Sequence, residues 1–177
     1  MSKKRIDNAK DPLSAFIGRT LALQSFRLTE MSAKCSLVNN NSDALPSHIH
    51  LNANVKSGTP DGHMAFLNTF ELKGSYDDNE SSAALLISAT FATLYSIDSL
   101  EEINSSDVQK FGQIAVIYLL WPFWRELVQS TTARMSLPPL TLPLHAMGSL
   151  EFSADSEVES AGKRNKVPNA APTRPKK

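Results

Sequence analysis

Two histidines, His48 and His50, have the spacing that most directly suggests chemistry. They stand two positions apart in the alternating segment 48–56, so both side chains point to one face of a predicted strand. Two such imidazoles can bind zinc, but a stable site needs further ligands, and Cys35 or His63 would have to come close. The favoured interpretation is a pair of solvated histidines on a polar strand face. The sequence therefore predicts no metal site.

Other residue types that could carry catalysis lack the patterns that catalysis needs. Cys35 is the only cysteine and has no local signature of a nucleophile. Ser, His and Asp all occur, yet the sequence contains no nucleophile elbow, phosphate-binding loop or glycine-rich dinucleotide motif. Arg125 and Glu126 are better explained as surface ion pairs, and Trp121 and Trp124 as core or interface anchors. The protein is therefore predicted not to be an enzyme and to need no cofactor.

Composition narrows the class of protein further. Lys and Arg together number 18, as do Asp and Glu, so the net charge is zero and nothing favours nucleic acid or anionic lipid. A single cysteine among 177 residues excludes an internal disulfide and fits a reducing compartment. The longest apolar run, 114–124, is too short for a bilayer, which needs about 20 residues. The basic N-terminus is not followed by the apolar region of a secretory signal. A cytoplasmic protein is expected.

Four strand candidates precede the helical part of the chain. They are residues 21–37, 48–56, 64–72 and 83–97. Apolar residues recur at every second position in the last three, as in half-buried strands. In the first candidate this parity changes between Leu23 and Phe26, which predicts a bulge or register change. The mostly short connections favour an antiparallel meander.

A long helix is predicted from about Val108 to Met135. Ser105, Ser106 and Asp107 supply its N-cap chemistry, and Pro122 should kink or split it. Residues 114–124 are apolar around nearly the whole circumference, more than one four-stranded sheet can cover. The helix is therefore expected to lie between subunits. The side chains predicted at that oligomer interface are Ile117, Leu120, Trp121 and Trp124.

The ends of the chain differ from its middle in composition. Residues 1–18 are polar and are predicted to be a flexible N-terminal segment, and residues 19–152 form the predicted folded domain. Residues 153–177 have almost no large apolar side chains and change from acidic to basic along their length. This composition predicts a disordered tail.

Two neighbouring motifs carry a resemblance to a known family. Residues 120–126 read LWPFWRE, and residues 132–143 read TARMSLPPLTLP. This order of an aromatic–Pro–aromatic–X–Arg–Glu segment, an arginine, a small residue and a Pro-rich apolar loop resembles the SecB family of export chaperones. Segments 23–28 and 84–87 also fall in the expected order, so the resemblance covers about residues 20–144. Ser136 stands where the family usually has glycine.

The resemblance implies both a fold and an activity. The fold is α+β, with a four-stranded antiparallel sheet packed with a long kinked helix, and protomers assemble as a dimer of dimers. The implied activity is that of an ATP-independent holdase chaperone, which keeps unfolded polypeptides competent for protein export. Clients would lie in apolar grooves between the sheet, the long helix and the Pro-rich loop. The candidate groove residues are Phe70, Leu72, Phe91, Leu137, Leu140 and Leu142, and core packing is an equal alternative for each of them.

The family also hands its clients to the SecA motor through the outer face of the sheet. Glu30 matches an acidic position used there, and Leu86 is a second candidate contact. Lys34 and Ser88 stand where acidic residues are expected. Two alternatives to general export therefore stay open: a SecB-like chaperone dedicated to one client, such as an antitoxin, and a non-catalytic oligomeric adaptor. Neither nucleic-acid binding nor membrane insertion is expected.

Overall fold

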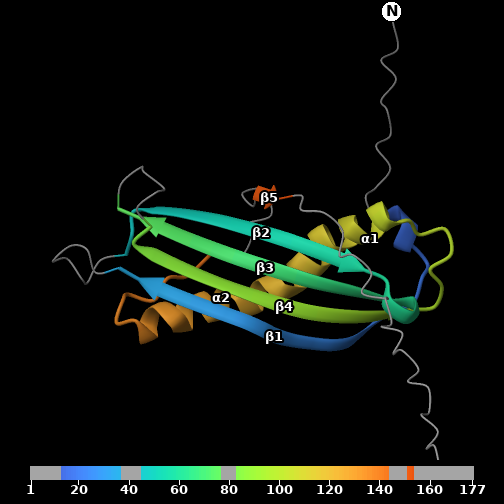
Figure 1. Ribbon diagram of the computed structural model, residues 1–177, viewed down its shortest axis with the longest axis horizontal. Coiled ribbons are helices and arrows are strands. Elements are labelled where there is room, and N and C mark those ends of the chain that lie inside the picture. The colour runs from blue at the N-terminus through green and yellow to red at the C-terminus, as the bar shows by residue number, and fades with distance from the viewer. Residues whose placement is uncertain (1–12, 37–44, 77–82, 144–150, 154–177) are drawn as a thin grey trace, which may run out of the picture.

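A twisted sheet with one long helical element on a single face forms the protein (Figure 1). The computed structural model describes residues 13–36, 45–76, 83–143 and 151–153. The elements in chain order are β1 (Leu21–Cys35), β2 (His48–Gly58), β3 (His63–Ser75), β4 (Leu85–Ile97), α1 (Ser105–Phe111), α2 (Ile117–Arg134) and β5 (Glu151–Ser153). The predicted α+β class, with four antiparallel strands and one long helix, is confirmed.

The strands follow the order β1-β4-β3-β2-β5 across the sheet. β2, β3 and β4 form an antiparallel meander, as the short connections predicted. β1 pairs antiparallel with β4 rather than with β2, so it becomes an outer edge of the sheet. The short β5 was not predicted, and it pairs in parallel with β2, from Asn52 to Asn54.

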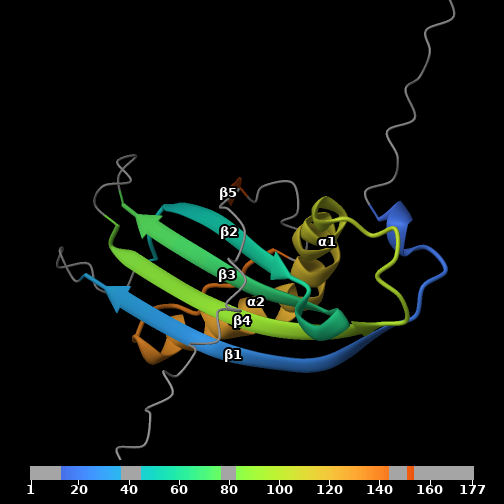
Figure 2. The same ribbon diagram turned by 45° about the vertical axis from the view of Figure 1, so that its right-hand side comes forward.

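The core lies between the sheet and the helical element. Met64, Phe66, Phe70 and Leu72 of β3 are each at most 2% exposed, as expected for the core-facing positions of an alternating strand. Figures 1 and 2 show the helical element crossing this inner face diagonally, from the β2 edge to the β1 edge. Because of this diagonal, α1 contacts β2 whereas α2 contacts β4.

A capping box begins the helical element. The Asn104 side chain accepts a hydrogen bond from the Asp107 amide at 2.9 Å, and the Asp107 carboxylate accepts one from the Asn104 amide at 3.4 Å. Of the predicted cap residues, Asp107 therefore takes part, but the cap itself is one residue earlier.

The departure from regular helix lies upstream of its predicted position. Residues Gly112–Val116 form a π-helical segment between α1 and α2, whereas α2 continues through Pro122. Gly112 lies close to the sheet, where an added Cβ would lie 2.7 Å from Phe66 Cδ1 and 2.8 Å from Val55 Cγ1. Pro122 is tolerated because it lies on the exposed side of α2, where water can reach the carbonyl that loses its amide donor.

Part of the predicted N-terminal segment packs on the domain. Ser14–Phe16 form a short 3₁₀ helix, and Phe16 is buried with its ring centroid 4.8 Å from that of Phe111. The remainder of that segment, residues 1–12, and tail residues 154–177 lie outside the described residues. No helix in the described part of the chain combines the length and the apolar character needed to cross a membrane.

Candidate functional site

Two irregularities in β1 keep its apolar side chains on one face. The register with β4 shifts between Leu23 and Ser25 and again between Leu28 and Glu30. The first shift confirms the bulge predicted from the change of parity. The apolar side chains of β1 consequently stand opposite core-facing residues of β4: Leu23 opposite Tyr95, Phe26 opposite Thr93, Leu28 opposite Phe91, and Met31 opposite Ala89. Without the bulges, half of them would face the outer side of the sheet.

These side chains are nevertheless exposed. Leu23 is 45% exposed, Phe26 36%, Leu28 44% and Met31 40%, although they share a face with the core. β1 is an edge strand, and the buried face of α2 is directed at the neighbouring strands. The core face of the sheet therefore extends beyond its helical cover.

α2 adds apolar side chains next to the exposed part of β1. Leu119 is 38% exposed and Phe123 is 47% exposed. The Phe26 ring lies between the two elements, 4.6 Å from the Phe123 ring and 5.8 Å from the Phe91 ring by centroid. These contacts join one apolar surface across the gap between strand and helix. We call it the apolar strip, formed by Leu23, Phe26, Leu28, Met31, Leu119 and Phe123.

The opposite flank of α2 is closed by the Pro-rich segment 137–143. The indole of Trp121 donates a hydrogen bond to the Pro143 carbonyl at 2.9 Å, and Arg125 Nε donates to the Leu142 carbonyl at 2.6 Å. Thr132 Oγ1 accepts from the Leu140 amide at 3.0 Å. Three side chains of the helix thus hold the segment by its backbone. This flank is filled, whereas the flank beside β1 is open.

Ser136 makes the turn between α2 and this segment. Its φ is 60°, in the left-handed region, and the next amide, that of Leu137, donates to the Thr132 carbonyl at 3.0 Å. A non-glycine residue pays a steric cost in this conformation.

Ser136→Gly is therefore expected to raise the free energy of unfolding by about 0.5–1 kcal/mol. Ser130→Gly, within α2, is the control and should lower it by about 0.5 kcal/mol because glycine weakens a helix interior. Urea unfolding of both variants measures these changes. A loss of stability in Ser136→Gly would contradict the proposed strain.

Known proteins share part of this sequence and this fold. A protein-export protein SecB of Anaplasma phagocytophilum (strain HZ) is 26% identical over 124 residues, covering 66% of this chain and 75% of that protein. A SecB-like chaperone of Mycobacterium tuberculosis, solved in complex with a ChAD peptide from the HigA1 antitoxin, aligns with a TM-score of 0.52 and 16% identity. That alignment covers 71% of this chain and 89% of the other. No family model matches.

The chain is similar to SecB in sequence and to a SecB-like chaperone in fold. The sequence similarity includes a protein named for export, and the structural similarity shows the shared fold. The resemblance carried by the proline-centred motif is thereby confirmed. The two halves of that motif are joined in the structure, because Trp121 and Arg125 of α2 donate hydrogen bonds to backbone carbonyls of the Pro-rich segment.

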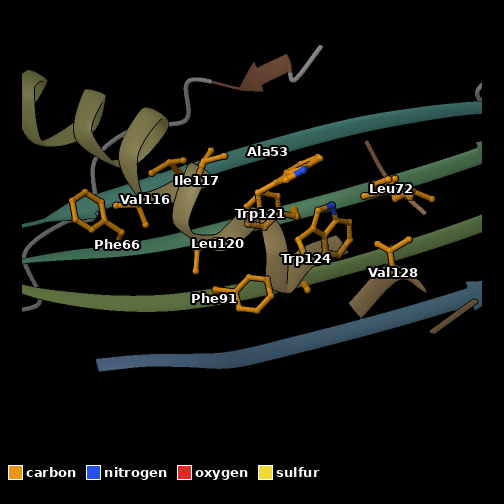
Figure 3. Close-up of a cluster of buried hydrophobic side chains, with 14 of the residues drawn as sticks. Ala53, Phe66, Leu72, Phe91, Val116, Ile117, Leu120, Trp121, Trp124 and Val128 are labelled. Atoms are coloured by element: carbon orange, nitrogen blue, oxygen red, sulfur yellow. The ribbon is translucent and has the colours of Figure 1, made fainter. Parts of the chain in front are cut away.

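The structure places the four predicted interface residues in the core between the helix and the sheet. Ile117 and Leu120 are 0% exposed, Trp121 is 6% and Trp124 is 1%. Trp124 stacks on Phe70 with ring centroids 5.5 Å apart, and Figure 3 shows both tryptophans among the core side chains between helix and sheet. Within one chain these four side chains are covered, so the side of the helix that a partner could reach is the other one. The exposed side carries Tyr118, Leu119 and Phe123.

The predicted groove residues also lie mostly in the core. Phe70, Leu72, Phe91, Leu137 and Leu142 are at most 6% exposed, and only Leu140 is partly exposed. Core packing, the alternative weighed for each of them, describes their place in this structure. The sequence analysis did not predict the apolar strip, because the apolar residues of β1 were used only to predict a strand and not a binding surface. The parity change at the bulge is the sequence signal for their common face, but their exposure depends on the position of β1 at the edge of the sheet.

The histidines predicted to be solvated lie on the outer face. His48 and His50 are exposed at one end of β2, whereas His63 begins β3 at the other end of the sheet. His63 stands ten residues along β3 from the partner of His50, roughly 33 Å away. Among the described residues, no three His, Cys, Asp or Glu side chains gather closely enough to hold a metal ion.

The outer face also carries the candidate motor contacts. Glu30 is exposed and Leu86 is half-buried, and Lys34 stands directly opposite Leu86 in the β1–β4 pairing.

Tyr95 of β4 is a buried titratable residue on the core side of the sheet. Burial raises the pKa of its hydroxyl above the ordinary value of 10.0. The contribution of Tyr95 to stability should therefore be kept below pH 10 and be lost as the pH rises above about 10, because its hydroxyl ionises first in the unfolded chain.

Proposed function

We propose that this protein is an ATP-independent holdase chaperone that binds unfolded polypeptides along the apolar strip. The observation that carries the proposal is the exposure of Phe26, Leu28 and Phe123 on a face continuous with the core. An isolated domain gains nothing from leaving such side chains in water, since each buried Leu or Phe contributes about 1.5–3 kcal/mol.

The chemistry of the strip suits clients of varied sequence. β1 is an edge strand, so its outward amides and carbonyls are placed to pair with an extended polypeptide. Main-chain hydrogen bonds are independent of client sequence, and the apolar floor accepts most large apolar side chains. Sequence-tolerant binding of this kind is what a holdase requires, and it needs no nucleotide.

We further propose that protomers assemble as a homotetramer, a dimer of dimers, through the outward side of α2. Tyr118 is 62% exposed, and with Leu119 and Phe123 it forms an apolar ridge on the side opposite the core. The ridge replaces the four core residues in the predicted interface. Self-association would bury this ridge, as expected for a helix that is more apolar than one four-stranded sheet can cover.

Two kinds of client distinguish the candidate roles. A role in the export of preproteins is supported by the relative named for protein export, and cytoplasmic handover to SecA would belong to that role. A dedicated antitoxin client is supported by the SecB-like chaperone that was solved with an antitoxin peptide. Lys34 and Ser88, in place of acidic residues on the outer face, favour the dedicated role over a SecA partnership. A peptide array separates them, because a dedicated chaperone should retain one sequence and a general one many.

The holdase activity itself can be tested with a chemically unfolded model client. We expect near-stoichiometric amounts of the protein to suppress light scattering as the client is diluted from denaturant, with no effect of added ATP. Mass measurement on the same sample gives the assembly state. Unchanged yield and aggregation kinetics of the client would contradict the proposed function.

A further inference from the structure

A second apolar hollow lies on the outer face of the sheet, on the side that the helices leave uncovered. Its volume is about 380 Å³, and it crosses the four long strands near one end. The outward side chains of β3 and β4 line its floor: Ala65, Leu67, Ala92 and Leu94. Arg27 of β1 and Lys56 of β2 stand at its two sides. None of the mechanism proposed above uses this surface.

The two cations give the hollow a definite charge preference. No acidic residue lines it, and among the described residues neither Arg27 nor Lys56 forms an ion pair. The ion pair recorded on this face, Lys73 with Glu71 at 2.8 Å, lies further along β3. An apolar floor between two exposed cations complements a chain segment that alternates acidic and apolar or small side chains.

β5 brings such a segment to the edge of the hollow. It pairs in parallel with β2, so that Ser153 stands beside Asn54 and the chain heads toward Lys56. The residues that follow include 155–159, Asp-Ser-Glu-Val-Glu, with three acidic side chains and no basic one.

The distances permit this segment to cross the hollow. Two residues along β2 and the four strand spacings from β5 to β1 correspond to about 7 Å and about 19 Å, a diagonal of about 20 Å from Ser153 to the Arg27 side. Six extended residues, 154–159, span at most about 20 Å. The segment therefore reaches both cations only when it is fully extended, with the side chains of Glu159 and Arg27 closing what remains of the gap.

We propose that residues 155–159 of the same chain dock in the outer hollow. Asp155 pairs with Lys56, Glu159 pairs with Arg27, and Val158 packs on the apolar floor. The docked segment would shield the outer face, so an acidic partner of that face would have to displace it. This proposal does not depend on the holdase activity, because it concerns the face opposite the apolar strip.

Disulfide trapping in the full-length chain tests the proposal. In a Cys35→Ser background, Val158→Cys is combined with Leu94→Cys in the hollow. The matched control combines Val158→Cys with Ser88→Cys, on the same face of β4 but six residues away. We expect the disulfide within one chain to form at least ten times faster for the Leu94 pair, as measured by non-reducing electrophoresis and mass spectrometry.

Charge reversal tests the electrostatic part. Arg27→Glu with Lys56→Glu, in the Leu94 pair, should slow trapping at least fivefold, and 0.5 M salt should slow it similarly in the parent. Leu67→Cys, at a position 42% exposed, replaces Leu94→Cys should that variant not fold. Three outcomes would overturn the proposal: equal rates in hollow and control positions, no response to charge reversal, or disulfides only between chains, which would assign the hollow to the tail of a second copy.

Discussion

Trp124→Ala is expected to lower the free energy of unfolding by about 3–5 kcal/mol, the usual cost of removing a large buried aromatic side chain. Trp124 is 1% exposed and stacks on Phe70, so the deletion leaves a cavity between helix and sheet. Its neighbour in sequence, Phe123, is 47% exposed and supplies the matched control. Phe123→Ala should change the free energy of unfolding of the protomer by less than about 1 kcal/mol, although it also removes part of the ridge proposed to join protomers.

Denaturant unfolding followed by circular dichroism measures both variants, at several protein concentrations because assembly adds to apparent stability. The decisive comparison is between stability and mass. If Trp124→Ala dissociates the oligomer but leaves the protomer as stable as Phe123→Ala does, this face of α2 is a subunit interface and not part of the core. Loss of protomer stability at every concentration supports its place in the core.

Leu28→Asp is expected to raise at least tenfold the amount of protein needed to suppress aggregation of an unfolded client. The tenfold change corresponds to about 1.4 kcal/mol of binding free energy, a modest part of the cost of burying an unpaired charge under a client. Leu28 is 44% exposed, so the substitution should leave the fold intact.

Ser32→Asp is the matched control for this variant. It introduces the same charge four residues further along β1, but Ser32 pairs with Ser88, on the outer face. Holdase activity should be unchanged. Light scattering of the diluted client measures activity, and static light scattering measures mass. If Leu28→Asp splits the assembly while client protection persists, the apolar strip is a contact between copies and not the client site.

The location of the apolar strip depends on the bulge in β1 and on the pairing of β1 with β4. The parity change between Leu23 and Phe26 is visible in the printed sequence and predicts the bulge. Whether the bulged strand lies inside the sheet or at its edge depends on its pairing with β4, a contact between residues 50 to 76 positions apart. Local pattern holds no information on such a pairing, so the exposure of Phe26 and Leu28 could not be read from it.

The amino-acid sequence by itself determined the strands, the long helix, the absence of recognisable catalytic motifs and the SecB-like motif, because alternation, capping chemistry and residue order are local properties. Only the tertiary structure decided which side of α2 is buried. Residues 114–124 are apolar all round, so helical periodicity favours no direction. The sheet made that choice by packing Phe70 against Trp124, which left Phe123 outside beside Phe26.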